Sequence, residues 1–103
     1  MILSIAKEKT ITPEALGNKK AKDPSTVTFK VPTSTDMERL LTEKPKDSEV
    51  FSEFVIRMTF TDDQGASIQP ATIPSMPGVY PLVAEVAREI LMSGMLGTDE
   101  KNE

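Results

Sequence analysis

The sequence predicts a small α+β domain with a short antiparallel sheet and about three helices. Residues 26–31 alternate apolar and polar side chains, as a half-buried strand does. Residues 80–93 instead repeat apolar pairs every four positions, which is typical of an amphipathic helix. A length of 103 residues fits one domain of ordinary size. We therefore expect a single domain over residues 1–103.

The N-terminal residues 1–25 show no strong pattern, and we expect them to form a loosely ordered arm. The apolar residues 2–6 suit either a short strand or an arm that docks on the core. In the stretch TPEALG, Thr12 suits a helix cap and Gly17 a helix stop, which leaves room for about one turn. The polar run that ends at Pro24 is typical of an exposed loop.

The strand over residues 26–31 is the clearest in the chain. It places Val27, Phe29 and Val31 on one face, and the following Pro32 favours its end. A single strand is not stable alone, so another segment must pair with it. The candidate segments are residues 2–6, 8–12 and 66–73.

A helix is predicted over residues 35–43. Thr35 and Glu38 have the spacing of a capping box, and Asp36 favours the N-terminal turn. Pro45 then prevents the helix from continuing.

Residues 48–59 fit two templates. As a helix, Ser48 caps the first turn and the apolar side chains form one stripe. As a strand, residues 54–60 alternate, and the following DDQG becomes the loop of a hairpin. Because the helical pattern covers the longer span, we predict a helix over residues 48–59.

The run Asp62-Asp63-Gln64-Gly65 predicts a tight turn. A calcium loop needs glycine at about its sixth position and an acidic ligand at its twelfth. Counted from Asp62, the sixth position is Ser67 and the twelfth is Ile73. Asp and Gly are also the residues that a turn prefers, for side-chain bonds to the backbone and for positive φ.

The helix over residues 80–93 is the strongest helical pattern. Gly94 and Gly97 are plausible stops. The final residues, 98–103, are polar, and we expect a disordered tail there.

The composition excludes the commonest catalytic and metal-binding chemistries. The chain has no cysteine and no histidine, so it lacks a thiol nucleophile and an imidazole base or ligand. It carries no phosphate-binding glycine motif and no nucleophile elbow. Glu85 and Glu89 stand four residues apart beside Arg88, which favours a solvated helix face over paired catalytic carboxylates. We predict no enzyme activity, no catalytic residue, no cofactor and no metal.

The net charge of −4 is unevenly distributed. Residues 1–30 hold six lysines against three acids, and the remainder holds six basic residues against thirteen acids. The lysines lack interleaved aromatic residues or a nucleic-acid motif, so we expect no nucleic-acid binding. No apolar run is long enough to span a membrane, and the N-terminus lacks the charge order of a signal peptide. We expect a cytoplasmic protein with no membrane association.

The end of the last predicted helix offers a candidate surface for a protein partner. Its apolar residues suit either the edge of the core or an adaptable surface that binds a partner helix. The edge of the core is the usual place of methionine on an apolar face, but six methionines in 103 residues keep the second interpretation open, because methionine adapts to varied apolar surfaces. The candidate partner-binding residues are Leu91, Met92, Met95 and Leu96.

The order of these elements matches a known pattern over residues 27–91. The strand VTFKVPT runs into the helix DMERLL, and an apolar helix ends in MTFTDDQG. The Pro-rich link PATIPSMPG then leads to the helix VYPLVAEVAREIL. This arrangement resembles the small tail assembly chaperones of long-tailed bacteriophages, with the region of Phe60 in place of the tryptophan usual before the turn.

The resemblance implies a non-enzymatic chaperone, encoded by a bacteriophage or prophage. Such a protein holds the long helical tape measure protein soluble by transient hydrophobic binding, until tail tube subunits polymerise around it. It acts in the host cytoplasm during virion assembly, and a homo-oligomer is compatible with this role. The alternatives are a structural virion or tail-completion protein, and a generic protein–protein adaptor domain.

Overall fold

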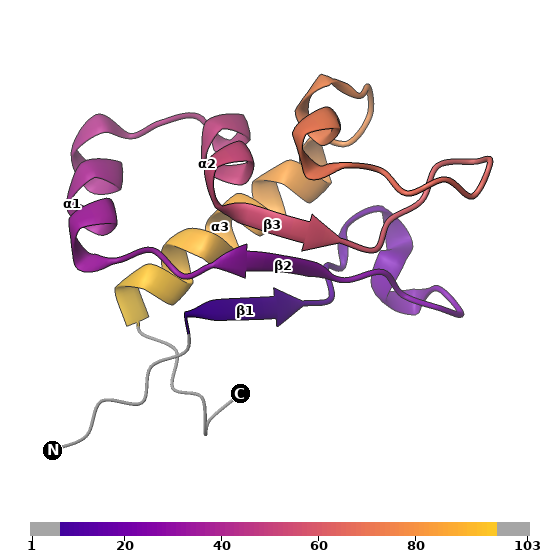
Figure 1. The fold of residues 1–103 in the computed structure, drawn as a ribbon, viewed down its shortest axis with the longest axis horizontal. Helices are drawn as coiled ribbons and strands as arrows, with labels where there is room; N and C mark the ends of the chain where they lie inside the picture. The colour runs from indigo at the N-terminus through magenta and orange to yellow at the C-terminus, as the bar shows by residue number, and fades with distance from the viewer. Residues whose placement is uncertain (1–6, 97–103) are drawn as a thin grey trace, which may run out of the picture.

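The structure, a computed structural model, describes residues 7–96 and combines a three-stranded antiparallel sheet with helices that cover one of its faces (Figure 1). The helix that ends the described chain crosses behind the sheet. The α+β class is therefore confirmed. The predicted disordered tail, residues 98–103, lies outside the described residues. In chain order the elements are β1 (Glu8–Ile11), the 3₁₀ segment η1 (Ala15–Lys20), β2 (Val27–Lys30), α1 (Ser34–Glu43), α2 (Asp47–Phe54), β3 (Val55–Met58), the 3₁₀ segment η2 (Pro70–Ser75) and α3 (Tyr80–Leu96).

The sheet is built around β2, which pairs with β1 on one side and β3 on the other. Val27 and Phe29 are fully buried, because their side chains point from β2 toward the helices. Thr28, between them, points the other way, and its hydroxyl is hydrogen-bonded to that of Thr10 on β1 at 2.8 Å. The alternation that predicted the strand thus also decides which of its faces enters the core.

Residues 8–12 supply one partner of the predicted strand, as one of the three candidates proposed. Glu8–Ile11 form β1 and pair antiparallel with β2. Residues 66–73 do not pair with β2: Ser67 forms an isolated bridge with Thr61, and a 3₁₀ segment follows. The candidate at residues 2–6 lies outside the described residues.

The prediction of one helix over residues 48–59 is wrong in its second half. The helix α2 ends at Phe54, and β3 begins at the next residue, Val55, without any linking residue. Val55 pairs with Phe29 of β2, with an irregularity in register before the following pairs. The edge of β2 offers unpaired backbone groups, and pairing with them outweighs the local helical pattern.

The helix α1 starts one residue before the predicted span 35–43, and a different pair caps it. The Thr33 hydroxyl accepts a hydrogen bond from the Asp36 N–H, and the Asp36 carboxylate accepts one from the Thr33 N–H, each at 3.0 Å. The predicted pair, Thr35 and Glu38, has the same spacing but lies inside the helix. The capping-box spacing occurs twice in overlapping positions, so the sequence alone did not show which pair caps the helix.

The predicted tight turn at residues 62–65 is confirmed. The Asp62 side chain accepts hydrogen bonds from the N–H groups of Gln64, at 2.8 Å, and Ala66, at 2.9 Å. Gly65 has a φ of 83°, in the left-handed region that glycine enters without strain. The Asp and Gly of this run therefore shape the backbone.

The arm expected over residues 1–25 contains β1 and a closed loop between β1 and β2. The Asn18 side-chain amide donates hydrogen bonds to the carbonyls of Pro13 and Ser25, and its oxygen accepts one from the Ser25 N–H. Asn18 is 9% exposed, so these bonds are largely shielded from water. The helical turn predicted to start at Thr12 lies further along the chain, in η1, which begins at Ala15.

The core lies between the sheet and the helices. α2 and α3 supply most of it, and Ile73 of η2 closes one end. The buried hydrophobic side chains are Val27, Phe29, Met37, Leu40, Val50, Phe51, Phe54, Ile73, Leu82, Val83, Val86, Ala87 and Ile90.

The helix α3 extends beyond the predicted span 80–93, because Gly94 continues it rather than stopping it. A Cβ added to Gly94 would overlap the sulfur of Met37 on α1 and lie 3.0 Å from Cβ of Pro32. The glycine thus permits close packing of α1 on α3. The other predicted stop, Gly97, lies outside the described residues.

Replacing Gly94 with alanine should destabilise the protein by up to about 2 kcal/mol. Alanine gains up to roughly 1 kcal/mol in helix propensity, but overpacking against Met37 and Pro32 costs about 1–3 kcal/mol. Urea denaturation followed by circular dichroism measures the difference. In a Met37→Ala background, which removes the overlapping sulfur, Gly94→Ala should be less harmful; an equal loss in both backgrounds would contradict the packing explanation.

Candidate protein-binding surface

The outward face of α3 changes from charged to apolar near Leu91. Before Leu91 the face carries Arg88 and Glu89, and the four predicted partner-binding residues begin with Leu91 itself. Met92 is 44% exposed, Met95 62% and Leu96 77%, while Leu91 is partly buried against the core. We call these four residues, Leu91, Met92, Met95 and Leu96, the terminal patch.

The helical period explains why the terminal patch faces outward. Ile90 and Ser93 are buried, and Gly94 lies against α1. The Ser93 hydroxyl donates a hydrogen bond to the Ile90 carbonyl at 2.8 Å, which satisfies the buried oxygen within the helix. With 3.6 residues per turn, positions 92, 95 and 96 form a second stripe on the side away from the core, and Leu91 lies at its border with the core. The helix therefore has an inner and an outer apolar stripe over its last turns.

Glu85, nearly two turns before the terminal patch, has a structural role that the sequence did not reveal. Its carboxylate accepts hydrogen bonds from the backbone N–H of Glu14, at 2.9 and 3.1 Å, and of Ala15, at 2.8 Å. Glu85 is therefore half-exposed on this face, and its carboxylate is hydrogen-bonded to the backbone rather than only to solvent. These hydrogen bonds tether the start of η1 to α3. Because they join residues about 70 positions apart, they cannot be predicted from a local sequence pattern.

Two shallow hollows lie beside this tether on the outer side of α3. One has a volume of about 450 Å³ and the other about 250 Å³, and both are bordered by Glu14, Glu85 and Glu89. Arg88 borders the larger hollow and Lys19 the smaller. Lys19 lies 3.6 Å from the Glu14 carboxylate. The wall next to the terminal patch is thus polar, with carboxylates in excess.

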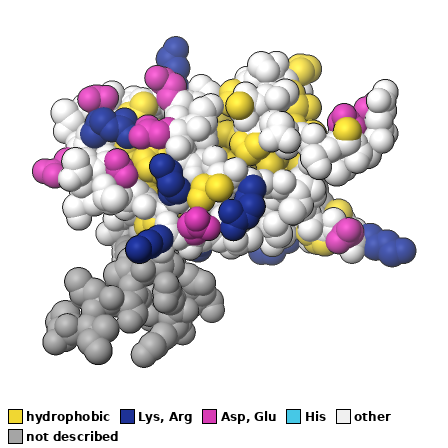
Figure 2. Space-filling view, in the orientation of Figure 1, with side chains coloured by type: hydrophobic (Ala, Val, Ile, Leu, Met, Phe, Trp, Pro, Cys, Tyr) yellow, Lys and Arg dark blue, Asp and Glu magenta, His cyan; other side chains and the backbone are white. Residues whose placement is uncertain are grey.

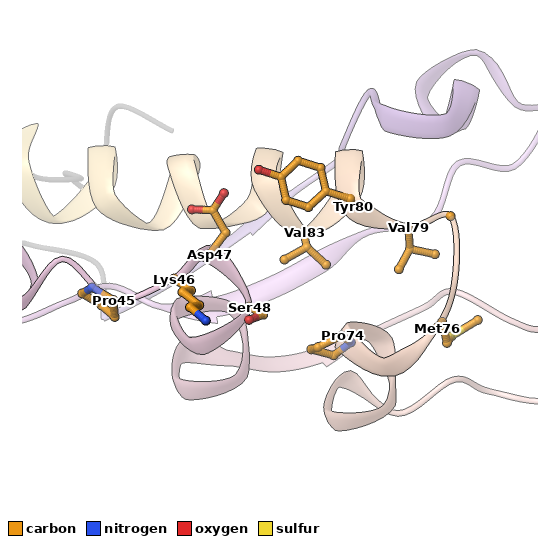
Figure 3. A pocket seen from close by; sticks show the side chains of 10 residues that line it. Pro45, Lys46, Asp47, Ser48, Pro74, Met76, Val79, Tyr80 and Val83 are labelled. Carbon is orange, nitrogen blue, oxygen red and sulfur yellow. The ribbon is translucent and has the colours of Figure 1, made fainter.

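A larger hollow, of about 500 Å³, lies between the start of α2, the segment η2 and the start of α3 (Figure 3). Pro74, Met76 and Val83 form an apolar wall, and Lys46 and Asp47 contribute one charge of each sign. The hollow is open rather than enclosed. An apolar group can rest there, but the lining lacks a nucleophile paired with a base.

Charged side chains of both signs are interspersed over the sheet, α1 and α2 (Figure 2). On this face Arg57 of β3 lies 3.3 Å from Glu8 of β1. Arg39 of α1 is paired with Glu53 of α2, and this hydrogen bond raises the pKa of the arginine above its ordinary value. The first pair spans β2 and connects the two edge strands, and the second connects α1 with α2.

Within residues 7–96, no three acidic side chains converge closely enough to hold a metal ion. In the same part of the chain, no helix is both long and apolar enough to cross a bilayer. Three of the seven large hydrophobic side chains that are exposed within residues 7–96 lie together in the terminal patch. Searches against models of protein families, curated proteins and solved structures gave no match for this chain.

Proposed function

We propose that this protein is a non-enzymatic chaperone that binds an amphipathic helix of a protein partner through the terminal patch. The observation that carries the proposal is the exposure of Met92, Met95 and Leu96 on one face of a well-packed helix. Exposed apolar side chains that adjoin one another mark interaction sites more often than scattered ones do. Methionine suits a surface that must accept different sequences, because its side chain is unbranched and flexible.

The resemblance over residues 27–91 supports a specific partner, the tape measure protein of a bacteriophage tail. A long amphipathic helix exposes an apolar stripe that aggregates unless another surface covers it. A standard stable interface uses about 20–30 residues from each partner. Four residues are far fewer, which suits a contact that must be released when the tail tube assembles.

Replacing both Met92 and Met95 with glutamine should weaken partner binding by at least about tenfold. Glutamine keeps the length and helix propensity of methionine but loses the apolar surface. The measurement is the soluble fraction of a co-expressed tape measure protein, together with its recovery on the tagged chaperone. The fold should persist, because both side chains are largely solvent-exposed.

Tyr80→Gln is the matched control, since Tyr80 is 70% exposed at the opposite end of the same helix. This variant should bind as the parent does. A Met92→Gln/Met95→Gln protein that still keeps the tape measure protein soluble would remove the terminal patch from the mechanism. Recovery of the chain from purified virions in stoichiometric amounts would favour the structural virion alternative.

A further inference from the structure

The terminal patch lies within a helical layer that is strongly acidic. Within the bounds of α1, α2 and α3 there are eight Asp and Glu residues but only two arginines. One of these, Arg39, is already paired with Glu53. Lys44 and Lys46, in the link between α1 and α2, only partly offset the difference. A partner that approaches this layer therefore meets a negative potential.

Carboxylates also lie immediately beside the patch. Glu89 precedes Met92 by three residues, which corresponds to about 4.5 Å along the helix axis. Within residues 7–96, Glu89 forms no hydrogen bond or ion pair, whereas Glu85 is engaged with the backbone of η1. Glu89 borders both hollows on the outer side of α3. Its carboxylate is thus available to a cation at the edge of the patch.

A basic side chain of the partner is the cation that best suits the Glu89 carboxylate. The carboxylates around the hollows do not converge as metal ligands do. Lysine and arginine can lay their apolar stems along Met92 and place their charged ends in the hollow beside Glu89. Arg88 and Lys19 border the same hollows, so the site accommodates one or two such groups rather than a polybasic chain.

Building on the proposed function, we infer that the preferred partner is an amphipathic helix with Lys or Arg next to its apolar stripe. The apolar stripe covers Met92 and Met95, and a basic side chain one turn away pairs with Glu89. Charge at the rim contributes mainly to specificity and to the rate of encounter, while the apolar contact supplies most of the affinity.

The test uses two synthetic helical peptides with the same leucine stripe, one flanked by lysine and the other by glutamate. Binding to the full chain is measured by fluorescence anisotropy at low and high salt. The lysine peptide should bind about tenfold more tightly at low salt, as expected for a few exposed charge pairs. The preference should fall to about twofold or less at about 1 M salt, where the Debye length is about 3 Å.

Two charge-reversal variants locate the effect. Glu89→Lys should lower the preference for the lysine peptide by roughly fivefold, because it replaces an attraction at the patch by a repulsion. Asp63→Lys makes the same charge change in the turn between β3 and η2, at the opposite end of the molecule from the last turn of α3 (Figure 1). It should leave the preference unchanged within about twofold.

The outcomes separate this inference from the proposed function. Equal binding of both peptides, lost in Met92→Gln/Met95→Gln, would overturn the charge preference and leave the chaperone surface intact. Binding of neither peptide would overturn both. Self-association through Met92 and Met95 that excludes the peptides would assign the patch to a second copy of the chain, and would also overturn both.

Discussion

Replacing Phe51 with alanine should lower the free energy of unfolding by about 3–5 kcal/mol. Phe51 is fully buried on the side of α2 that faces α3. The substitution removes a large apolar surface from the core and leaves a cavity that the surrounding elements fill only in part. A small domain has about 5–15 kcal/mol of stability in total, so the variant should sit close to the unfolding threshold.

Urea denaturation followed by far-ultraviolet circular dichroism measures this loss. The chain has no tryptophan and a single tyrosine, so fluorescence is a poor probe of its core. Tyr80→Ala is the matched aromatic control, because Tyr80 is 70% exposed, and it should change the stability by less than about 0.5 kcal/mol. Similar losses for the two variants would show that α2 does not pack as described.

Replacing Asn18 with alanine should cost about 2–4 kcal/mol. The Asn18 amide donates to the carbonyls of Pro13, at 2.8 Å, and Ser25, at 2.9 Å, and accepts from the Ser25 N–H at 2.9 Å. Its loss leaves three backbone groups without partners, at least one of them in a buried position. Amide hydrogen exchange should show the largest loss of protection around residues 13–25.

Asn18→Asp tests whether the hydrogen-bond pattern, rather than the volume of the side chain, is responsible. Aspartate keeps an acceptor for the Ser25 N–H but places negative oxygens against two carbonyls. It should be at least as destabilising as alanine. Lys19→Ala, at the exposed neighbour, should be nearly neutral. If Asn18→Asp had the stability of the parent, the closed loop would not depend on these donors.

The parts of the fold that follow from local patterns were predictable. The strand around Val27 and Phe29 and the helix from residue 80 each bury one face, and such a face is visible as a period in the sequence. The tight turn at Asp62 was predictable for a similar reason, since Asp and Gly act on their own backbone.

The segment after Phe54 could not be assigned from its own residues. Phe51 and Phe54 continue a helical stripe, yet Val55 and Ile56 also suit a strand. The edge of β2 that β1 leaves unpaired decides that this segment forms a strand. That edge is a feature of the tertiary fold and not of the segment. The hydrophobic pattern of one segment does not show that another strand has an unpaired edge.

The candidate site was predictable in its apolar part and not in its polar surroundings. The helical period places Met92 and Met95 on one face, and the structure shows both exposed. The carboxylates beside them gain their arrangement from Glu14, which reaches α3 from the other end of the chain. Contacts of such long sequence separation are set by the tertiary fold alone.

The direct junction of α2 and β3 also limits how this chain can change in length. One residue inserted between Phe54 and Val55 would exchange the two faces of β3, because side chains alternate along a strand. The face now packed on the helices would then point into water. Insertions are far better tolerated in the stretch between β3 and η2, which contains a turn and does not join one element directly to the next.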